Sequence, residues 1–323
     1  MKKIAIGILG YNEELGVSQL LDSLKKQILL QQKNYEITVT VVSNGSTDNM
    51  AAVSRQKIAD FVELGVKSQV VELPIADKCA AWNYFVHQAE KDADYYILLD
   101  ADVTIVNSDS LTELITRLEQ NPESRLCAGK VIDRRGNLVA HRLDGKCYAA
   151  RGSILRNIAI PKGIVMDDTY VLVTAVTNWY ETDFETGDRK GYLQQCSTVT
   201  VCSGSTPRDR NFSYWLACRK RTIMGGYVQG QVDYCMRNIF GGGNHAKLVS
   251  MNLFQTNPNW FTQYLAKRFE APKFDPSFVV RSLFSLKDVV QFVVYCYCYV
   301  LSLKGIRDQE FGSLAWRLKS RYW

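Results

Sequence analysis

Two aspartates separated by one residue, Asp100 and Asp102, directly follow an apolar run at residues 95–99. An apolar run without alternation is typical of a strand buried on both faces, and open α/β sheets bind their ligands just past the carboxyl ends of such strands. Carboxylates at that place can hold a hard divalent cation, which in turn can hold phosphates. The alternative interpretation is an acidic turn, because Asp is a common turn residue.

The segments upstream repeat one pattern that would place these aspartates at the edge of a sheet. Apolar, β-branched segments at residues 4–9, 37–42 and 69–73 are each followed by a polar turn and a helix-like segment. Four strands separated by helices predict a parallel, doubly wound, Rossmann-like sheet whose loops of interest meet at one edge. After Asp102 the pattern becomes irregular, so the chain as a whole is predicted to be an α/β protein with a mixed sheet.

Charge is unevenly distributed along the 323 residues, although the formal net charge is only +6. Residues 203–323 hold 17 Lys or Arg against 7 Asp or Glu, whereas residues 1–202 hold 22 against 26. A basic C-terminal part predicts an anionic partner. We predict no nucleic-acid partner, because no nucleic-acid recognition motif accompanies the charge.

The last third also contains an apolar run at residues 289–303, which is shorter than the roughly 20 residues that a spanning helix needs. Basic residues flank the run, and Trp316 and Trp323 lie in a basic segment beyond it. This composition predicts an element that lies in the headgroup region of an anionic membrane. The alternative is a buried core helix followed by a polar tail.

The start of the sequence and its cysteines indicate a cytoplasmic, reducing environment. Met1-Lys2-Lys3 leads straight into a strand-like segment, unlike a signal peptide. Nine cysteines are an odd count without a C-x-x-C pair, which argues against a disulfide framework and a structural zinc site. We therefore expect a protein on the cytoplasmic side, peripheral on the inner face of the membrane.

Five motifs occur in the order and spacing of one known family. They are Gly10-Tyr11-Asn12-Glu13-Glu14, Ser43-Asn44-Gly45-Ser46-Thr47-Asp48, Lys78-Cys79-Ala80-Ala81-Trp82-Asn83, Leu99-Asp100-Ala101-Asp102 and Met166-Asp167-Asp168-Thr169. With them, roughly the first 225 residues resemble a family 2 glycosyltransferase of the inverting GT-A type, membrane-associated. The resemblance implies the GT-A fold, and we add to it a C-terminal helical extension that associates with membrane.

The resemblance also implies a donor site built from the turns after the first two strands and the helix after the third. Its residues would be Tyr11, Asn12, Glu13, Asn44 and Asp48 around the base and ribose of a UDP- or GDP-sugar, with Lys78 and Asn83 nearby. Two of these have simpler interpretations. Asn44-Gly45 suits any turn that needs a positive φ, and Lys78 suits the exposed start of a helix.

The family's chemistry is assigned to the two acidic pairs. Asp102 would bind Mn²⁺ or Mg²⁺ bridging the donor diphosphate, and Asp100 would contact the ribose or the ion's water shell. Asp168 would be the general base that takes the acceptor hydroxyl's proton, with Asp167 holding a nearby backbone group or cation. The alternative is that Asp167 and Asp168 cap the following helix, and both roles are compatible.

A basic run occupies the place where related synthases carry Gln-x-x-Arg-Trp. Here it contains Arg219, Lys220 and Arg221, which keeps the arginine and loses the glutamine and tryptophan. We predict that Arg221, with Arg219, binds the diphosphate. The missing tryptophan argues against a processive polymer synthase.

These features predict a two-part chain, with a glycosyltransferase domain at residues 1–230 and a basic, partly apolar helical extension at 231–323. The domain would divide into a nucleotide-binding half at 1–103 and an acceptor half at 104–230. The predicted enzyme is a metal-dependent, hexosyltransferase-type inverting transferase that moves a single sugar to a lipid, lipid-linked or polysaccharide acceptor at the cytoplasmic membrane face. The alternatives are a transferase for a soluble glycan or protein, and a non-catalytic scaffold with the same fold.

Overall fold

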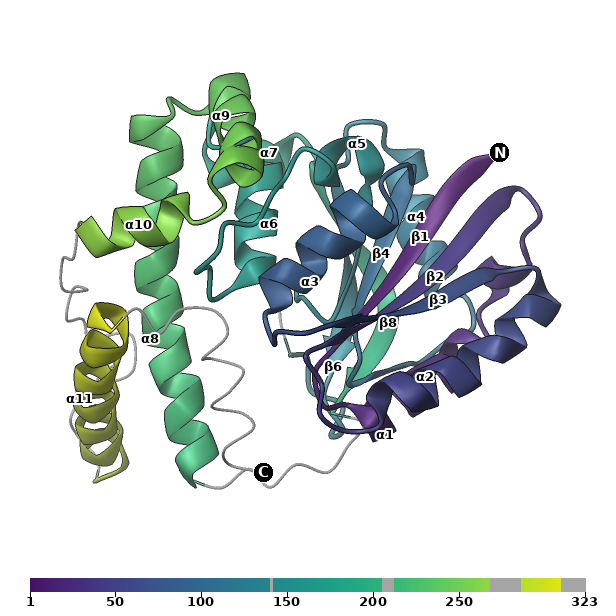
Figure 1. Cartoon of the computed structure of the whole chain (residues 1–323), viewed down its shortest axis with the longest axis horizontal. Helices are drawn as coiled ribbons and strands as arrows, with labels where there is room; N and C mark the ends of the chain where they lie inside the picture. Colours follow the sequence, from purple (N-terminus) through teal and green to yellow (C-terminus); the bar gives the residue numbers. More distant parts are fainter. Residues whose placement is uncertain (140–141, 205–211, 268–285, 309–323) are drawn as a thin grey trace.

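The computed structural model of the chain describes residues 1–139, 142–204, 212–267 and 286–308. One eight-stranded mixed sheet forms its centre, in the order β3-β2-β1-β4-β7-β6-β8-β5 (Figure 1). The strands are β1 (Lys2–Gly10), β2 (Tyr35–Asn44), β3 (Lys67–Leu73), β4 (Tyr95–Asp100), β5 (Val103–Ile105), β6 (Leu126–Ile132), β7 (Cys147–Arg151) and β8 (Leu193–Ser203).

Helices cover the sheet and continue beyond it into the C-terminal part. They are α1 (Glu14–Leu24), α2 (Met50–Ile58), α3 (Lys78–Tyr84), α4 (Ser110–Gln120), α5 (Gly152–Leu155), α6 (Asp167–Val176), α7 (Phe184–Arg189), α8 (Phe212–Tyr234), α9 (Gly243–Thr256), α10 (Trp260–Lys267) and α11 (Leu286–Arg307). Short 3-10 or π turns lie at η1 (Ile28–Gln31), η2 (Ala59–Leu64), η3 (Phe85–Ala89) and η4 (Cys235–Ile239).

The first four strands have the predicted parallel arrangement. β1 pairs in parallel with β2 and β4, and β2 pairs in parallel with β3, so the carboxyl ends of all four strands meet at one edge. β7 then runs antiparallel to β4 and makes the sheet mixed. These pairings confirm the predicted doubly wound α/β sheet.

Two apolar clusters lie on opposite faces of the sheet, because successive side chains of a strand point to opposite sides. Ile4, Ile6 and Ile8 of β1 pack in one cluster with residues of α1, α2 and α4. Ala5 and Leu9 of the same strand pack in the other cluster with residues of α3 and α6 (Figure 1). Burial on both faces explains why the sequence of β1 is a continuous apolar run without alternation.

The C-terminal helices share the second cluster with the sheet. Val232 of α8 and Phe261 of α10 are fully buried in the same cluster as Trp82 of α3. The predicted domain boundary at residue 230 falls inside α8, which runs unbroken to Tyr234. Among the described residues, both sides of this boundary contribute to one apolar cluster, and the division into two domains stays a prediction.

α11 packs along α8 and carries the predicted apolar run (Figure 1). Within the described ranges, each helix is either too short or too polar to cross a bilayer.

Candidate active site

The loops that follow β1 and β2 are joined to each other at the sheet edge. Asn12 adopts a left-handed backbone conformation with φ of 53°, which asparagine tolerates better than most residues. Its backbone N–H donates to the Ser46 hydroxyl at 3.1 Å, and its side-chain oxygen accepts the Thr47 N–H at 2.7 Å. Asp48 accepts the backbone N–H of Glu14 at 3.0 Å. The two predicted nucleotide loops therefore form one rigid unit.

Asn44 fixes the third loop to the same unit. It is 2% exposed, and its side-chain oxygen accepts the backbone N–H of Asp77 at 3.0 Å. Gly45 follows with φ of 67°, and a Cβ there would lie 2.4 Å from the Ala76 nitrogen. The positive-φ interpretation of the Asn44-Gly45 pair therefore has a physical basis, since the turn requires glycine, and the asparagine oxygen holds the loop that leads into α3. Contact of Asn44 with a donor stays a prediction.

Lys78 lies between the two acidic pairs. Its Nζ is 2.9 Å from Asp100 Oδ1 and 3.2 Å from Asp167 Oδ2, and its side chain is only 11% exposed. Burial by itself would lower the pKa of this ammonium, but the carboxylates of Asp100, Asp167 and Asp168 outweigh burial and hold the pKa well above its ordinary value. Lys78 is therefore a buried cation that joins the end of β4 to the start of α6, and it is not an exposed charge at a helix start.

Asp167 and Asp168 occupy the first turn of α6, where the positive end of the helix dipole favours negative charge. Met166 is the N-cap residue of this helix, and no side chain caps it, so the capping alternative is not what the structure shows. Asp168 accepts the Gly145 N–H at 3.1 Å and the Thr169 N–H at 2.8 Å.

The two carboxylates have different surroundings. Asp167 is 6% exposed, and its burial raises its pKa, against the opposing effect of Lys78. Asp168 is less buried and is held by backbone N–H groups on two sides. Asp168 is therefore the more accessible of the two to a molecule that enters the site.

A second lysine lies beside the end of β4. β7 pairs with β4 so that the Lys146 carbonyl accepts the Asp100 N–H at 3.2 Å. The Lys146 ammonium binds the Asp144 carboxylate, with Nζ 3.1 and 3.3 Å from its two oxygens. Sequence reasoning did not select Asp144 or Lys146, because only the antiparallel register of β7 on β4 brings them to the acidic motif.

Asn83 and the two predicted arginines have distinct surroundings. Both ends of the Asn83 amide bind the backbone of Ile160, each at 2.9 Å, so this side chain holds the segment that leads to α6. Arg221 donates to the Val165 carbonyl at 3.3 Å and contributes to the charge around Asp167. Arg219, on the same helix, has its electrostatic effect on Cys298 of α11.

The acidic motif suits a hard cation. Asp100 and Asp102 offer carboxylate oxygens at a strand end, the ligands that Mg²⁺ and Mn²⁺ prefer. No group of three or more ligating side chains occurs among the residues that the structure places. Two protein carboxylates with the remaining ligands from substrate phosphates are a usual arrangement for Mg²⁺. The residues present therefore fit a cation that binds together with a diphosphate.

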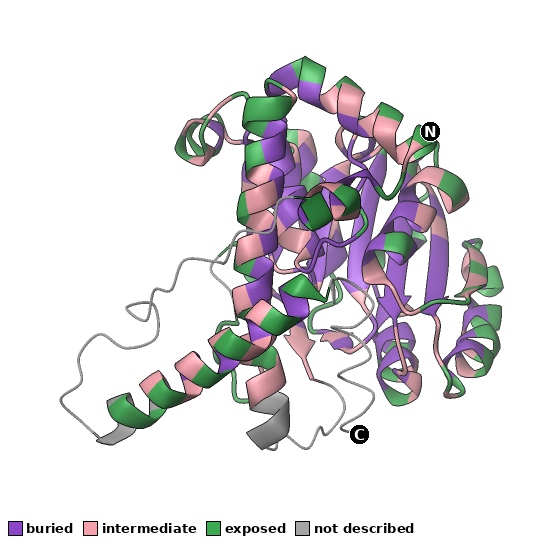
Figure 2. Ribbon diagram, turned by 60° about the vertical axis from the view of Figure 1, so that its left-hand side comes forward, coloured by how far each residue is buried: buried purple, intermediate pink, exposed green. Residues whose placement is uncertain are grey.

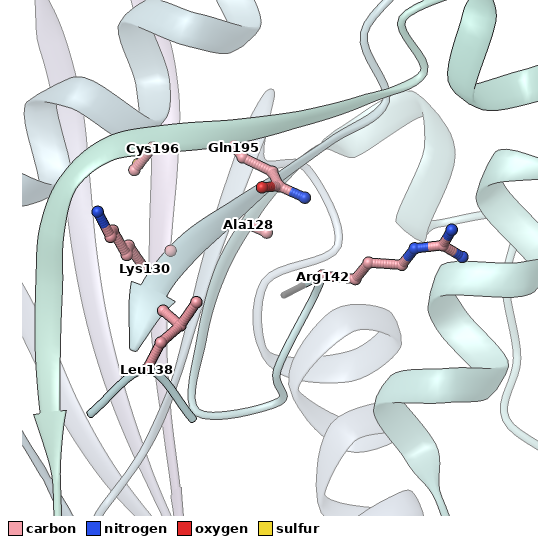
Figure 3. Close-up of a pocket in the computed structure, with 7 residues that line it drawn as sticks. Ala128, Lys130, Leu138, Arg142, Gln195 and Cys196 are labelled. Atoms are coloured by element: carbon pink, nitrogen blue, oxygen red, sulfur yellow. The ribbon is translucent and has the colours of Figure 1, made fainter. Parts of the chain in front are cut away.

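A separate cavity of about 170 Å³ opens between β6 and β8 (Figure 3). Its lining residues are Ala128, Gly129, Lys130, Leu138, Arg142, Gln195 and Cys196. The Arg142 side chain extends away from it, and its guanidinium lies 4.4 Å from the Phe184 ring centroid. None of the predicted donor or catalytic residues lines this cavity.

The fold and the acidic edge together define a glycosyltransferase of the GT-A class. The family described as Glycosyl transferase family 2 matches residues 6–169, about half of the chain, and the chain belongs to this family. That match includes every predicted donor and acidic residue except the arginines of α8. No curated protein shows significant sequence similarity to the chain.

A solved structure of a mannosyltransferase shares the fold, and two further solved structures show weaker similarity. A mannosyltransferase from Pyrobaculum calidifontis, in complex with GDP-Man and Mn²⁺, is 16% identical over 99% of this chain and 87% of its own, with a TM-score of 0.55. S. aureus TarS (residues 1–349) is 15% identical over 99% of this chain and 91% of its own, with a TM-score of 0.48. Glucosyl-3-phosphoglycerate synthase from Mycobacterium tuberculosis, with Mg²⁺ and UDP, is 17% identical over 69% and 78%, with a TM-score of 0.46.

Proposed function

We propose that this protein is an inverting, metal-dependent glycosyltransferase that moves one sugar from a UDP- or GDP-sugar to a lipid, lipid-linked or polysaccharide acceptor on the cytoplasmic face of a membrane. The observation that carries the proposal is the joining of the two acidic pairs by Lys78, which bridges Asp100 and Asp167. This bridge supports the proposal because it joins the strand that ends in the proposed cation ligands to the helix that begins with Asp167 and the proposed base, Asp168. The family and the donor of the Pyrobaculum calidifontis relative support a nucleotide sugar as the donor.

In this proposal Asp168 takes the proton of the acceptor hydroxyl. The hydroxyl oxygen forms a bond to the anomeric carbon as the bond to the diphosphate oxygen breaks, so the configuration at that carbon inverts. The Gly145 and Thr169 N–H groups fix the orientation of the Asp168 carboxylate before the reaction. A proton acceptor fixed in this way contributes typically 10²- to 10⁴-fold to the rate.

The leaving nucleoside diphosphate develops negative charge that must be stabilised. Asp102 and Asp100 would hold Mn²⁺ or Mg²⁺, which supplies Lewis-acid stabilisation of that charge when bound. Lys78 is buried beside Asp100 and stays protonated, so it adds a fixed positive charge to the same place. Arg221 lies near Asp167 and would contact the diphosphate from α8.

The sequence-based roles of three residues change in this proposal. Asn83 holds the backbone of Ile160, and we assign it to positioning of the base-bearing segment, not to donor contact. Asn44 holds the loop before α3 through its oxygen. Arg221 contacts the segment that leads to α6, so we assign diphosphate binding first to Arg221, with Arg219 as the second candidate.

Donor binding is tested by isothermal titration of the whole chain with a panel of nucleotide sugars, with and without Mn²⁺. We expect a UDP- or GDP-sugar to bind in Mn²⁺, and to bind at least tenfold more weakly in EDTA, because Asp100 and Asp102 would hold a cation that offsets the negative charge of the diphosphate. A chain that binds none of the panel in either condition refutes the proposed activity and favours the scaffold alternative.

We propose a membrane-bound acceptor because α11 has two apolar faces, of which one is buried in the protein and the other is exposed. One face packs on α8 and buries Tyr295, Cys298, Ser302 and Ile306, with Cys298 and Ser302 fully buried. The Ser302 hydroxyl also donates to the Lys220 carbonyl at 3.3 Å. This face of α11 is therefore part of the core, as the alternative interpretation of the apolar run predicted.

The opposite face of α11 presents an exposed apolar stripe (Figure 2). Val289, Val293, Tyr297 and Val300 are 43%, 60%, 54% and 62% exposed, and their spacing of three and four residues places them on one side of the helix. Lys304, exposed in the next turn, extends the same side. An apolar stripe that ends in a basic residue, in a part of the chain with a surplus of ten positive charges, suits an anionic membrane surface.

Substituting the stripe is expected to release the protein from vesicles. Val293→Glu together with Val300→Glu should lower the fraction bound to anionic vesicles about tenfold or more, because each buried valine contributes on the order of 1 kcal/mol and each glutamate is repelled. The measurement is co-sedimentation with phosphatidylserine-containing vesicles at low and high salt.

Val62→Glu is the matched control, since Val62 is 72% exposed on η2 at the other end of the molecule. It should bind vesicles like the unmodified chain. If the unmodified chain ignores anionic vesicles at every salt concentration, the membrane part of the proposal fails and a soluble glycan or protein becomes the preferred acceptor.

A further inference from the structure

Lys146 and Asp144 form an ion pair at the edge of the acidic motif. Besides the contacts of the ammonium, the Lys146 backbone N–H donates to Asp144 Oδ1 at 2.9 Å, so the aspartate closes a tight turn just before β7. The Asp100 N–H fixes the Lys146 carbonyl from the other side. The backbone of Lys146 is therefore held at two points, while its long side chain ends in an ammonium that binds the neighbouring Asp144 carboxylate.

The ammonium lies in the field of the cation-binding carboxylates. Burial by itself would lower the pKa of this group, but the carboxylates of Asp144, Asp100 and Asp102 outweigh burial and keep the pKa of Lys146 above its ordinary value. Lys146 thus lies on the β7 side of Asp100, whereas Lys78 lies on the α6 side. Its side chain is 26% exposed, so it can be reached by a ligand at the sheet edge.

The charges at the sheet edge show what such a lysine can bind. The carboxylates of Asp100, Asp102, Asp144, Asp167 and Asp168 lie along this edge, and Lys78, Lys146 and Arg221 are cations among them. A diphosphate that enters with a divalent cation brings further negative charge, and a flexible ammonium beside the motif can turn toward it.

We propose that Lys146 is a further donor-binding residue, which releases Asp144 and binds the diphosphate of the nucleotide when the donor or product is present. Asp144 acts as a competing partner that holds the ammonium when the site is empty and keeps it from pairing with Asp100 or Asp102. This inference rests on the proposed function, because it takes the ligand at the acidic motif to be a nucleoside diphosphate.

The test compares nucleoside diphosphate with monophosphate. Dissociation constants of UDP, GDP, UMP and GMP are measured in Mn²⁺ for the unmodified chain and for Lys146→Met. For the nucleoside that binds, the substitution should raise the dissociation constant of the diphosphate roughly tenfold or more, the usual loss for a charge-assisted contact, and leave that of the monophosphate within about twofold.

Asp144→Asn is expected to have the opposite effect on diphosphate affinity. A gain in affinity cannot be explained by misfolding of the variant. Asparagine keeps an oxygen for the Lys146 N–H and removes the competing charge, so diphosphate should bind roughly two- to fivefold more tightly. Lys130→Met is the control, because Lys130 is an exposed lysine on β6 whose ammonium contacts the Ser197 carbonyl at 3.4 Å. It should change neither constant.

Two outcomes overturn the inference while leaving the proposed function intact: equal weakening of diphosphate and monophosphate in Lys146→Met, or weaker diphosphate binding in Asp144→Asn. If the unmodified chain binds neither UDP nor GDP, the proposed function itself fails, and the inference fails with it.

Discussion

Asp168→Asn is expected to lower the rate of sugar transfer by roughly 10²- to 10⁴-fold while donor affinity stays within about twofold. Asparagine has nearly the same size but cannot accept the proton of the acceptor hydroxyl. Transfer is measured with saturating donor and acceptor, and donor binding by titration. The anomeric configuration of the product gives an independent check, because a single displacement must invert it.

The substitution should cost little stability. The introduced asparagine keeps one oxygen for either the Gly145 or the Thr169 N–H, so the variant loses one of two hydrogen bonds, worth about 1 kcal/mol. Asp183→Asn is the matched control: Asp183 accepts the Thr186 N–H at 2.6 Å at the start of α7 and has no predicted role in transfer. Loss of transfer in Asp167→Asn, with Asp168→Asn fully active, would give the base role to Asp167.

Asp102→Asn is expected to remove the dependence of donor binding on Mn²⁺ and to lower turnover by about a hundredfold or more. A bound cation supplies several kcal/mol of charge stabilisation, and each 1.4 kcal/mol is a factor of about ten in rate. The measurement is donor titration and turnover across a range of Mn²⁺ and in EDTA. The variant in Mn²⁺ should resemble the unmodified chain in EDTA.

Asp94→Asn is the control for this second substitution. Asp94 lies next to the opposite end of β4, is exposed, and accepts the Lys3 N–H at 2.8 Å. The substitution removes a carboxylate beside the same strand but leaves the sheet edge that bears the motifs unchanged. The dependence of donor binding and turnover on Mn²⁺ should therefore be unchanged. Near-normal turnover of Asp102→Asn in EDTA would show that the metal site is not at the end of β4.

Local sequence determined the first part of the sheet and the loops that follow its strands. The apolar runs that became β1, β2 and β4 are buried on both faces, and that burial leaves a signal in each segment by itself, whereas β3 lies at the sheet edge and is only partly buried. Capping is equally local: Asp77 accepts the Ala80 N–H at 3.2 Å and starts α3 where the pattern predicts a helix. A parallel sheet then brings the polar turns to one edge, because the connections between parallel strands leave no other arrangement.

Contacts between distant segments decided the surroundings of the site residues. Lys78 lies 22 residues before Asp100 and 89 before Asp167, and only the packing of α3 against β4 and α6 makes it a bridge between them. Asn83 resembles a donor residue in its motif, but its amide binds Ile160, 77 residues away. No local pattern encodes either pairing.

The same limit applies to the two features that sequence alone left open or missed. Residues 289–303 are apolar apart from Gln291 and Ser302, so their periodicity cannot tell a core helix from one that contacts membrane. Packing on α8 shows that one face is buried and the other exposed. Lys146 has no motif of its own. The antiparallel register of β7 on β4, which pairs Cys147 with Leu99, is what brings its ammonium to the acidic edge, because register depends on partners that the local sequence does not contain.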